Sequence, residues 1–170
     1  MKRIGLLSDT HSCWDDRFQL HLGGCDEIWH AGDVGCIDVI RRLESIAPVV
    51  RAVSGNIDHG EVCRRCPELL EFKVEDVDVL MTHIGGYPGR YSRGMAELLR
   101  RDGIKLMVAG HSHILRVMYD KQLGLLHLNP GAAGYAGWQK VRTLMRFVID
   151  GQDIRDLEVI ELARQRDVIK

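Results

Sequence analysis

Residues 2–11 read Lys2-Arg3-Ile4-Gly5-Leu6-Leu7-Ser8-Asp9-Thr10-His11, an apolar run that ends in two side chains able to bind a metal. Later in the chain, further apolar runs lead into short polar segments of the same kind: Gly32-Asp33, Gly55-Asn56, Thr82-His83 and Gly110-His111-Ser112-His113. Parallel α/β sheets gather such residues at the carboxyl ends of their strands. We therefore expect these ligands to meet at one edge of a sheet and to form one polynuclear metal site.

The first third of the chain predicts a βαβαβ unit. Strands are expected over residues 2–8, 26–30 and 49–54, and helices over residues 14–22 and 37–46. Gly23-Gly24 ends the first helix, and Pro48 follows the second. Such a unit implies parallel strands joined by right-handed crossover connections.

The pattern then changes to one that predicts a second sheet. Residues 69–74 and 77–82 suggest a hairpin, a helix is expected over 91–101 and a buried strand over 104–109. Consecutive antiparallel strands are expected over residues 116–120, 124–129, 143–150 and 154–160. Two sheets in one domain stack face to face, with helices on the outside. The expected fold is therefore an α/β, four-layer α/β/β/α sandwich with two mixed β-sheets flanked by helices, in a single domain over residues 1–170.

Composition excludes several classes of protein. The formal net charge is -1, so no strong overall field favours nucleic acid or an anionic membrane. The apolar start is too short for a signal peptide and no run is long enough for a membrane span, so a cytoplasmic location is expected. Five cysteines, an odd number, argue against a disulfide framework. Cys63 and Cys66 form a lone C-x-x-C that we interpret as structural or incidental, with half a zinc site or a redox pair as alternatives.

The residue types indicate the chemistry. Asp9 and His11 are two positions apart, so on an extended strand they point the same way and can share a metal. Gly32 lets backbone and metals approach closely, since no Cβ intervenes, and the carboxylate of Asp33 has two oxygens that can bridge two cations. Nitrogen and oxygen ligands without thiolate suit manganese, iron, cobalt, nickel or zinc.

Two such cations are usually ~3.5–4 Å apart. A hydroxide that bridges them has its pKa lowered towards neutrality and can attack phosphorus in line. The metals then neutralise the charge that develops on the phosphoryl oxygens.

The ordered series D-x-H, G-D, G-N, H and G-H-x-H resembles the calcineurin-like metallophosphoesterases, and Asn129-Pro130-Gly131 resembles their small prokaryotic phosphodiesterase branch. The resemblance implies a dinuclear site for two divalent ions, with manganese preferred and iron, zinc, nickel or cobalt as alternatives. By the family pattern the first metal has the ligands Asp9, His11, Asp33 and His113. The second has the ligands Asp33, Asn56, His83 and His111. Asn129-Pro130-Gly131 is a plain turn or a source of backbone N–H groups for phosphate.

The chain departs from the family at one position. Many members carry a histidine after the G-N asparagine, thought to protonate the leaving group, and this chain has Ile57. The metal-held residues Asp33, Asn56 and His83 are the expected catalytic residues, with His59 as a candidate general acid. We expect either a preference for esters with acidic leaving groups or a substitute for the acid, from His59 or a metal-bound water.

The loop over residues 85–91 is either a plain connection or a rim for the substrate. In the second reading Arg90 or Arg93 binds a phosphate, Tyr87 or Tyr91 stacks on a leaving group, and Asn56 also contacts the substrate. The remaining histidines, His21, His30 and His127, are interpreted as structural or supporting.

The predicted function is hydrolysis of a small phosphate ester by a metal-dependent phosphodiesterase, with nucleic acid beyond nucleotides disfavoured. A homo-oligomer is left open. The alternative is a non-catalytic protein-binding scaffold of the same fold with a residual metal site, similar to the retromer subunit. The retained set of ligands favours the enzyme.

Overall fold

The computed structural model describes residues 1–163, so residues 164–170 of the predicted domain lie outside it. One sheet has the strand order β12-β11-β1-β2-β3. Its strands are β1 (Lys2–Leu7), β2 (Glu27–His30), β3 (Val49–Ala52), β11 (Arg142–Asp150) and β12 (Asp153–Leu162). The first three run parallel, as the βαβαβ pattern predicts, and β11 joins β1 in the antiparallel sense.

The other sheet has the strand order β4-β5-β8-β10-β9. Its strands are β4 (Leu69–Val74), β5 (Val77–Thr82), β8 (Leu106–Val108), β9 (Leu115–Asp120) and β10 (Leu125–Pro130). Strands β5, β8 and β10 are parallel, whereas β4 and β9 form the antiparallel edges. Both sheets are therefore mixed, as expected.

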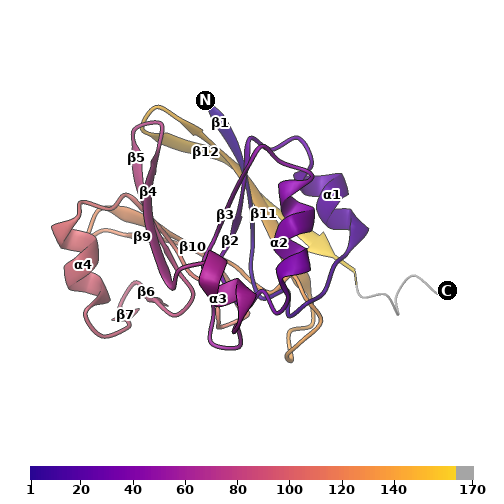
Figure 1. Ribbon diagram of the computed structural model, residues 1–170. Helices are drawn as coiled ribbons and strands as arrows, with labels where there is room; N and C mark the ends of the chain where they lie inside the picture. The colour runs from indigo at the N-terminus through magenta and orange to yellow at the C-terminus, as the bar shows by residue number, and fades with distance from the viewer. Residues whose placement is uncertain (164–170) are drawn as a thin grey trace.

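Helices cover the outer faces of the two stacked sheets (Figure 1). The helices are α1 (Asp16–Leu22), α2 (Ile37–Glu44), α3 (Glu61–Arg65) and α4 (Met95–Arg101). Figure 1 shows α1 and α2 on one side of the molecule and α4 on the other, outside the second sheet. The predicted four-layer sandwich is confirmed.

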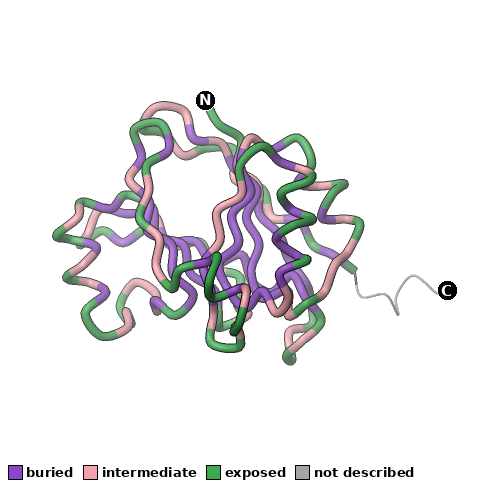
Figure 2. Tube along the Cα trace, viewed as in Figure 1, coloured by how far each residue is buried: buried purple, intermediate pink, exposed green. Residues whose placement is uncertain are grey.

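Successive side chains of a strand point to opposite faces of its sheet, so a separate core forms between each pair of layers. Figure 2 shows buried residues concentrated on the strands. On β1, Leu6 packs between the sheets, while Leu7 packs under α1 and α2. On β5, Met81 faces the core between the sheets and Leu80 faces α4. Each central strand is apolar on both faces, which explains why these stretches are continuous hydrophobic runs in the sequence.

Several predicted boundaries shift for local reasons. Helix α1 starts at Asp16 rather than residue 14, because Asp15 caps it by accepting a hydrogen bond from the Arg17 N–H at 3.0 Å. Helix α4 starts at Met95 rather than residue 91, since Gly94 adopts a left-handed conformation. The short helix α3 and the small hairpin of β6 (Gly86–Tyr87) and β7 (Arg90–Tyr91) were not predicted.

The prediction of four consecutive antiparallel strands near the end of the chain is wrong. Strands β9 and β10 form one hairpin and β11 and β12 another, but the two hairpins belong to different sheets. Residues 131–141 connect them without a tight turn. Strand β11 instead pairs with β1, where Leu144, Met145 and Phe147 fill cores on both faces of the sheet.

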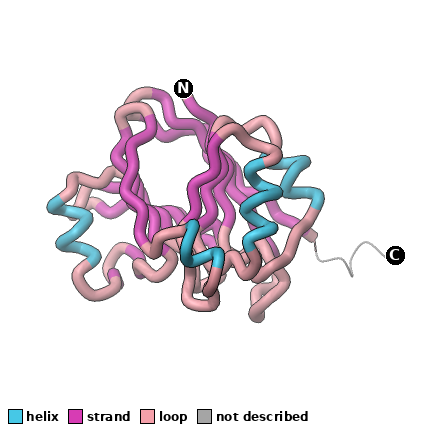
Figure 3. Tube along the Cα trace, in the orientation of Figure 1, coloured by secondary structure: helices cyan, strands magenta, loops and turns pink. Residues whose placement is uncertain are grey.

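Loops gather along the lower edge of both sheets in Figure 3, below the ends of the central strands. Strands β1, β2 and β3 are parallel neighbours, as are β5 and β8, so their carboxyl ends lie together. This arrangement positions the polar segments of the sequence. Among residues 1–163, no helix has the length and apolar character needed to cross a membrane. All five cysteines are free, with Cys63 exposed and Cys66 buried.

His127 on β10 attaches the small hairpin to the outer face of the second sheet. Its Nε2–H donates to the carbonyl oxygen of Gly86 at 3.0 Å, so Nδ1 is the unprotonated nitrogen. Burial lowers the pKa of His127 to about 4. The ring is therefore neutral in the folded chain at neutral pH, which confirms the structural interpretation of this histidine.

This burial predicts a loss of stability in acid. Unfolded histidine has a pKa of about 6.5, so the unfolded chain binds more protons than the folded chain as the pH falls from about 6.5 to about 4. From about pH 7 to about pH 5, His127 should reduce the free energy of unfolding by about 2 kcal/mol. Urea unfolding of the wild type and of His127→Phe at both pH values measures this contribution. Equal losses in the two proteins would contradict it.

Candidate metal centre

Backbone hydrogen bonds join the loops that carry the predicted ligands. The Asp9 N–H donates to the Gly32 carbonyl at 2.9 Å, which ties the loop after β1 to the loop after β2. The Gly110 N–H donates to the His83 carbonyl at 3.1 Å, which ties the loops after β8 and β5. The two sheets meet where the His111 N–H donates to Oδ2 of Asp9 at 3.2 Å.

Five of the seven predicted ligands have a left-handed backbone. The φ angles are 55° for Asp9, 47° for His11, 52° for Asp33, 68° for His111 and 57° for His113. Positive φ is uncommon outside glycine, and such strain collects at functional sites. The prediction that an extended strand turns Asp9 and His11 to the same side is therefore wrong, because neither residue has an extended backbone. They converge because the chain turns sharply after β1.

Asp9 lies at the centre of the site and is fully buried. Its Oδ2 accepts hydrogen bonds from the Ser8 hydroxyl at 2.6 Å and from the His111 N–H. Its Oδ1 lies 3.1 Å from Nε2 of His113 and 3.9 Å from Nε2 of His83. Within residues 1–163 this oxygen has no hydrogen-bond partner. One carboxylate oxygen is thus fixed by the protein and the other is left for a ligand.

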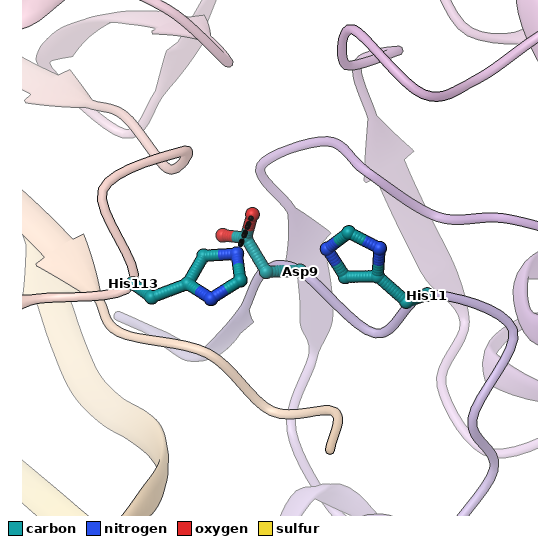
Figure 4. A group of neighbouring side chains, drawn as sticks. All are labelled: Asp9, His11 and His113. Atoms are coloured by element: carbon teal, nitrogen blue, oxygen red, sulfur yellow. Dashed lines mark ion pairs between the residues drawn. The ribbon is translucent and has the colours of Figure 1, made fainter. Parts of the chain in front are cut away.

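Two histidines turn their Nε2 towards the carboxylates and anchor the ring through Nδ1–H. Nδ1–H of His83 donates to the Ala31 carbonyl at 2.7 Å, and Nδ1–H of His113 donates to Oε1 of Gln139 at 3.0 Å. Metal-binding histidines use their second nitrogen in this way. Figure 4 shows the His113 ring turned towards the Asp9 carboxylate, with His11 nearby.

The two oxygens of Asp33 face different histidines. Oδ1 accepts a hydrogen bond from the Ile57 N–H at 3.1 Å and lies 3.2 Å from Nε2 of His83. Oδ2 lies 3.5 Å from Nε2 of His11. Burial alone would raise the pKa of Asp33, but His83 and the Ile57 N–H outweigh it and hold this pKa below its usual value. The carboxylate is therefore ionised.

The donor atoms form two overlapping groups, Asp9-His11-His113 and Asp9-Asp33-His83, in each of which the ligand atoms lie within 4.8 Å of one another. Within residues 1–163, Nε2 of His11 and Nε2 of His83 also have no hydrogen-bond partner. Lone pairs of buried nitrogen and oxygen atoms that face each other repel unless a proton or a cation lies between them. Divalent cations with borderline nitrogen and oxygen preferences fit this donor set.

The pKa values of two histidines also indicate a site that favours positive charge. Burial alone would lower the pKa of His83, but Asp33 and Asp9 outweigh it and raise this pKa above its usual value. The carboxylate of Asp9 raises the pKa of His113. Both rings therefore lie in a field that attracts positive charge.

The other predicted residues lie at the rim. His111 is exposed, and the centroid of its ring is 5.3 Å from that of His83. Asn56 is exposed in the turn after β3, next to Gly55, where a Cβ would collide with Asp33. His59 is exposed, and its Nδ1–H donates to the Ile57 carbonyl at 3.2 Å.

Gly32 also makes room for a histidine ring, a role that the sequence did not indicate. It has a φ of +95°, and a Cβ at this position would lie 2.6 Å from Nδ1 of His83. The missing side chain thus makes room for the imidazole of His83 as it reaches the Ala31 carbonyl.

Sequence reasoning assigned no supporting role to Asp58 or Gln139. The carboxylate of Asp58 accepts hydrogen bonds from the N–H groups of Val34, Gly35 and Gly55 at 3.0, 2.7 and 2.8 Å. It therefore joins the loops after β2 and β3. For Asp58, its position two residues after Asn56 was the sequence feature that could have indicated this role. Gln139 lies in a loop with no recognisable motif.

His30 and Asn129 also support the loops, as the sequence suggested for His30. Nε2 of His30 lies 2.9 Å from the Thr10 hydroxyl, and Nδ1 accepts a hydrogen bond from the Gly32 N–H. The Asn129 amide donates to the Gly110 carbonyl at 2.9 Å. The N–H of Gly131 donates to Asn129 Oδ1, so this turn does not offer that group to phosphate.

A cavity of about 250 Å³ adjoins the centre beside His83 and His111. Tyr87 and Arg90 line it, whereas Asn56 does not. Arg93, the alternative to Arg90, is outside its wall, and Tyr91 instead donates a hydrogen bond to Asp120 at 2.7 Å.

Known proteins resemble this chain along most of its length. A profile of the calcineurin-like phosphoesterase superfamily domain matches residues 1–152. A probable metallophosphoesterase of Methanothermobacter thermautotrophicus is 32% identical over 146 residues, which cover 76% of each chain.

Solved structures share the fold at lower identity. A structure described as a novel archaeal phosphodiesterase is 21% identical, with a TM-score of 0.69 over 94% of this chain and 99% of its own. Vps29 from Entamoeba histolytica complexed with zinc is 16% identical, with a TM-score of 0.72 over 94% of this chain and 98% of its own. These likenesses support the fold, and the match of the superfamily profile together with the archaeal relative decides the family. The chain belongs to the calcineurin-like phosphoesterase superfamily.

Proposed function

We propose that this chain is a divalent-metal-dependent phosphodiesterase that hydrolyses a small phosphate ester. One observation carries the proposal: the buried atoms Asp9 Oδ1, His11 Nε2 and His83 Nε2 converge without hydrogen-bond partners within residues 1–163. A protein rarely leaves several such atoms together unless a ligand satisfies them. The family membership of the chain supplies the class of reaction.

The ligand sets proposed from the family pattern are Asp9, His11, Asp33 and His113 for one ion, and Asp33, Asn56, His83 and His111 for the other. The two oxygens of Asp33, one near His11 and one near His83, support its bridging position. Asp9 Oδ1 also lies within 4 Å of histidines from both sets. We prefer manganese, and iron, zinc, nickel or cobalt suit the same donors.

Two divalent ions held there would activate water as the nucleophile and neutralise charge on the phosphoryl oxygens. Asp33 and His83 contribute fixed positions for the donor atoms, because each is buried and oriented by a backbone group. Arg90 and Tyr87 line the adjacent cavity and are proposed to bind the ester, together with Asn56 at the rim.

The leaving group has no obvious proton donor in this arrangement. The side chain of Ile57 is exposed and apolar, and its N–H is engaged by Asp33. His59 lies two residues further on and is exposed, so it remains the candidate general acid. We propose either that esters with acidic leaving groups are preferred or that His59 supplies the proton.

The alternative function is that of a non-catalytic protein-binding scaffold. The Vps29 structures share the fold of this chain. The complete set of seven proposed metal ligands favours the enzyme over a scaffold that keeps only a residual metal site. The five free cysteines fit a reducing compartment, so we propose a cytoplasmic location. A homo-oligomer remains a prediction.

Removing the bridging carboxylate should remove both metal and activity. Asp33→Asn keeps the size of the side chain but loses its charge, so we expect fewer bound ions and at least about a hundredfold lower kcat/KM. Elemental analysis and turnover of bis(p-nitrophenyl) phosphate with added manganese measure the two effects. Asp38→Asn is the control, since Asp38 forms an exposed ion pair with Arg41. Wild-type metal content and rate in Asp33→Asn would refute the assignment.

The rate should depend steeply on the leaving group. Without a general acid, esters of poor leaving groups lose about 10²–10⁴-fold relative to an assisted reaction. A series of aryl and alkyl phosphodiesters gives the slope of log kcat/KM against the pKa of the leaving group. A flat dependence would contradict the missing acid, and a wild-type slope and rate in His59→Ala would exclude His59.

A further inference from the structure

The charged side chains that line the cavity beside the proposed metal centre are all basic. Its wall contains Arg90 and Arg116 together with His83, His111 and His127, and no aspartate or glutamate of residues 1–163. His127 is neutral, because burial lowers its pKa to about 4. Since His83 and His111 belong to the proposed metal centre, the positive charge specific to the cavity comes from the two arginines.

Arg116 is fixed close to the loop that carries His111. It lies on β9 directly opposite Asn129 of β10, and the Asn129 amide donates to the Gly110 carbonyl and to the Ser112 hydroxyl. The Arg116 guanidinium carbon is 3.7 Å from the centroid of the Tyr87 ring. One Nη1–H of Arg116 donates to the Met118 sulfur at 3.9 Å. Stacking on an aromatic face orients the guanidinium plane and leaves its other N–H groups able to bind an anion.

Neither arginine of the cavity forms an ion pair within residues 1–163, whereas arginines elsewhere do. Arg51 pairs with Glu27 at 2.8 Å, and Arg142 pairs with Asp15 at 3.0 Å. Arg116 is only partly exposed, so its charge is partly removed from water without a protein carboxylate in compensation. An anionic ligand would supply that compensation.

We propose that this cavity is a subsite for a second phosphate group, so that the preferred substrate carries a phosphate in addition to the ester that is cleaved. The inference rests on the proposed phosphodiesterase function and adds the class of substrate. Arg116 is the principal contact, and the exposed Arg90 adds attraction. Two guanidinium groups suit a doubly charged phosphate, which offers oxygens to both.

Three non-hydrolysable probes test the subsite on the full chain with the metal it retains on purification. They are propylphosphonate, the bisphosphonate with the same three-carbon chain, and the matching phosphonocarboxylate. Calorimetry should give the bisphosphonate a Kd that is roughly tenfold to a hundredfold lower than that of propylphosphonate. In Arg116→Gln the two Kd values should agree within about twofold. Arg100→Gln, an exposed arginine of α4 outside this cavity, should keep the wild-type ratio.

Equal Kd values for the bisphosphonate and propylphosphonate in the wild type would overturn the subsite, as would a preference that survives in Arg116→Gln. A phosphonocarboxylate that binds as tightly as the bisphosphonate would overturn the assignment to phosphate. Hydrolysis of bis(p-nitrophenyl) phosphate, measured in parallel, tests the proposed function separately, because the ratio of Kd values requires no turnover.

Discussion

The main constraint on this structure is a cluster of buried oxygen and nitrogen atoms whose lone pairs face one another. Asp9, Asp33, His11 and His83 bring oxygen and nitrogen atoms to one point between the ends of two sheets, where little water reaches them. Such a cluster is costly unless a cation neutralises it. The raised pKa values of His83 and His113 express the same demand for positive charge. A divalent metal would satisfy it with the donors that the chain provides.

Holding these atoms in place requires a strained backbone, and the supporting residues explain how it persists. Left-handed angles at Asp9, Asp33 and His111 turn the loops sharply inward. Asp58, with its three hydrogen bonds from backbone N–H groups, holds two of those loops, and Asn129 holds a third. Hydrogen bonds around the site thus stabilise the strained loop conformations, as is typical of functional sites.

Much of the fold could be predicted because its central strands are buried on both faces and therefore appear as apolar runs. The same runs end in the predicted ligands, so the candidate site was visible as an ordered set of motifs. The arrangement of β11 was not predictable, because strand pairing between residues 2–7 and 142–150 depends on contacts far apart in the sequence. The role of Gln139 was hidden for the same reason, since only the fold brings it to His113.

The sequence by itself determined the two-sheet sandwich, the family pattern and which residue types could bind a metal, because hydrophobic periodicity and motif order are local properties. Only the tertiary structure decided how Asp9 and His11 converge, why Gly32 must lack a side chain and that Arg116 stacks on Tyr87 beside the centre. These facts arise from turns and contacts between distant strands. No local pattern encodes the distance between two such atoms.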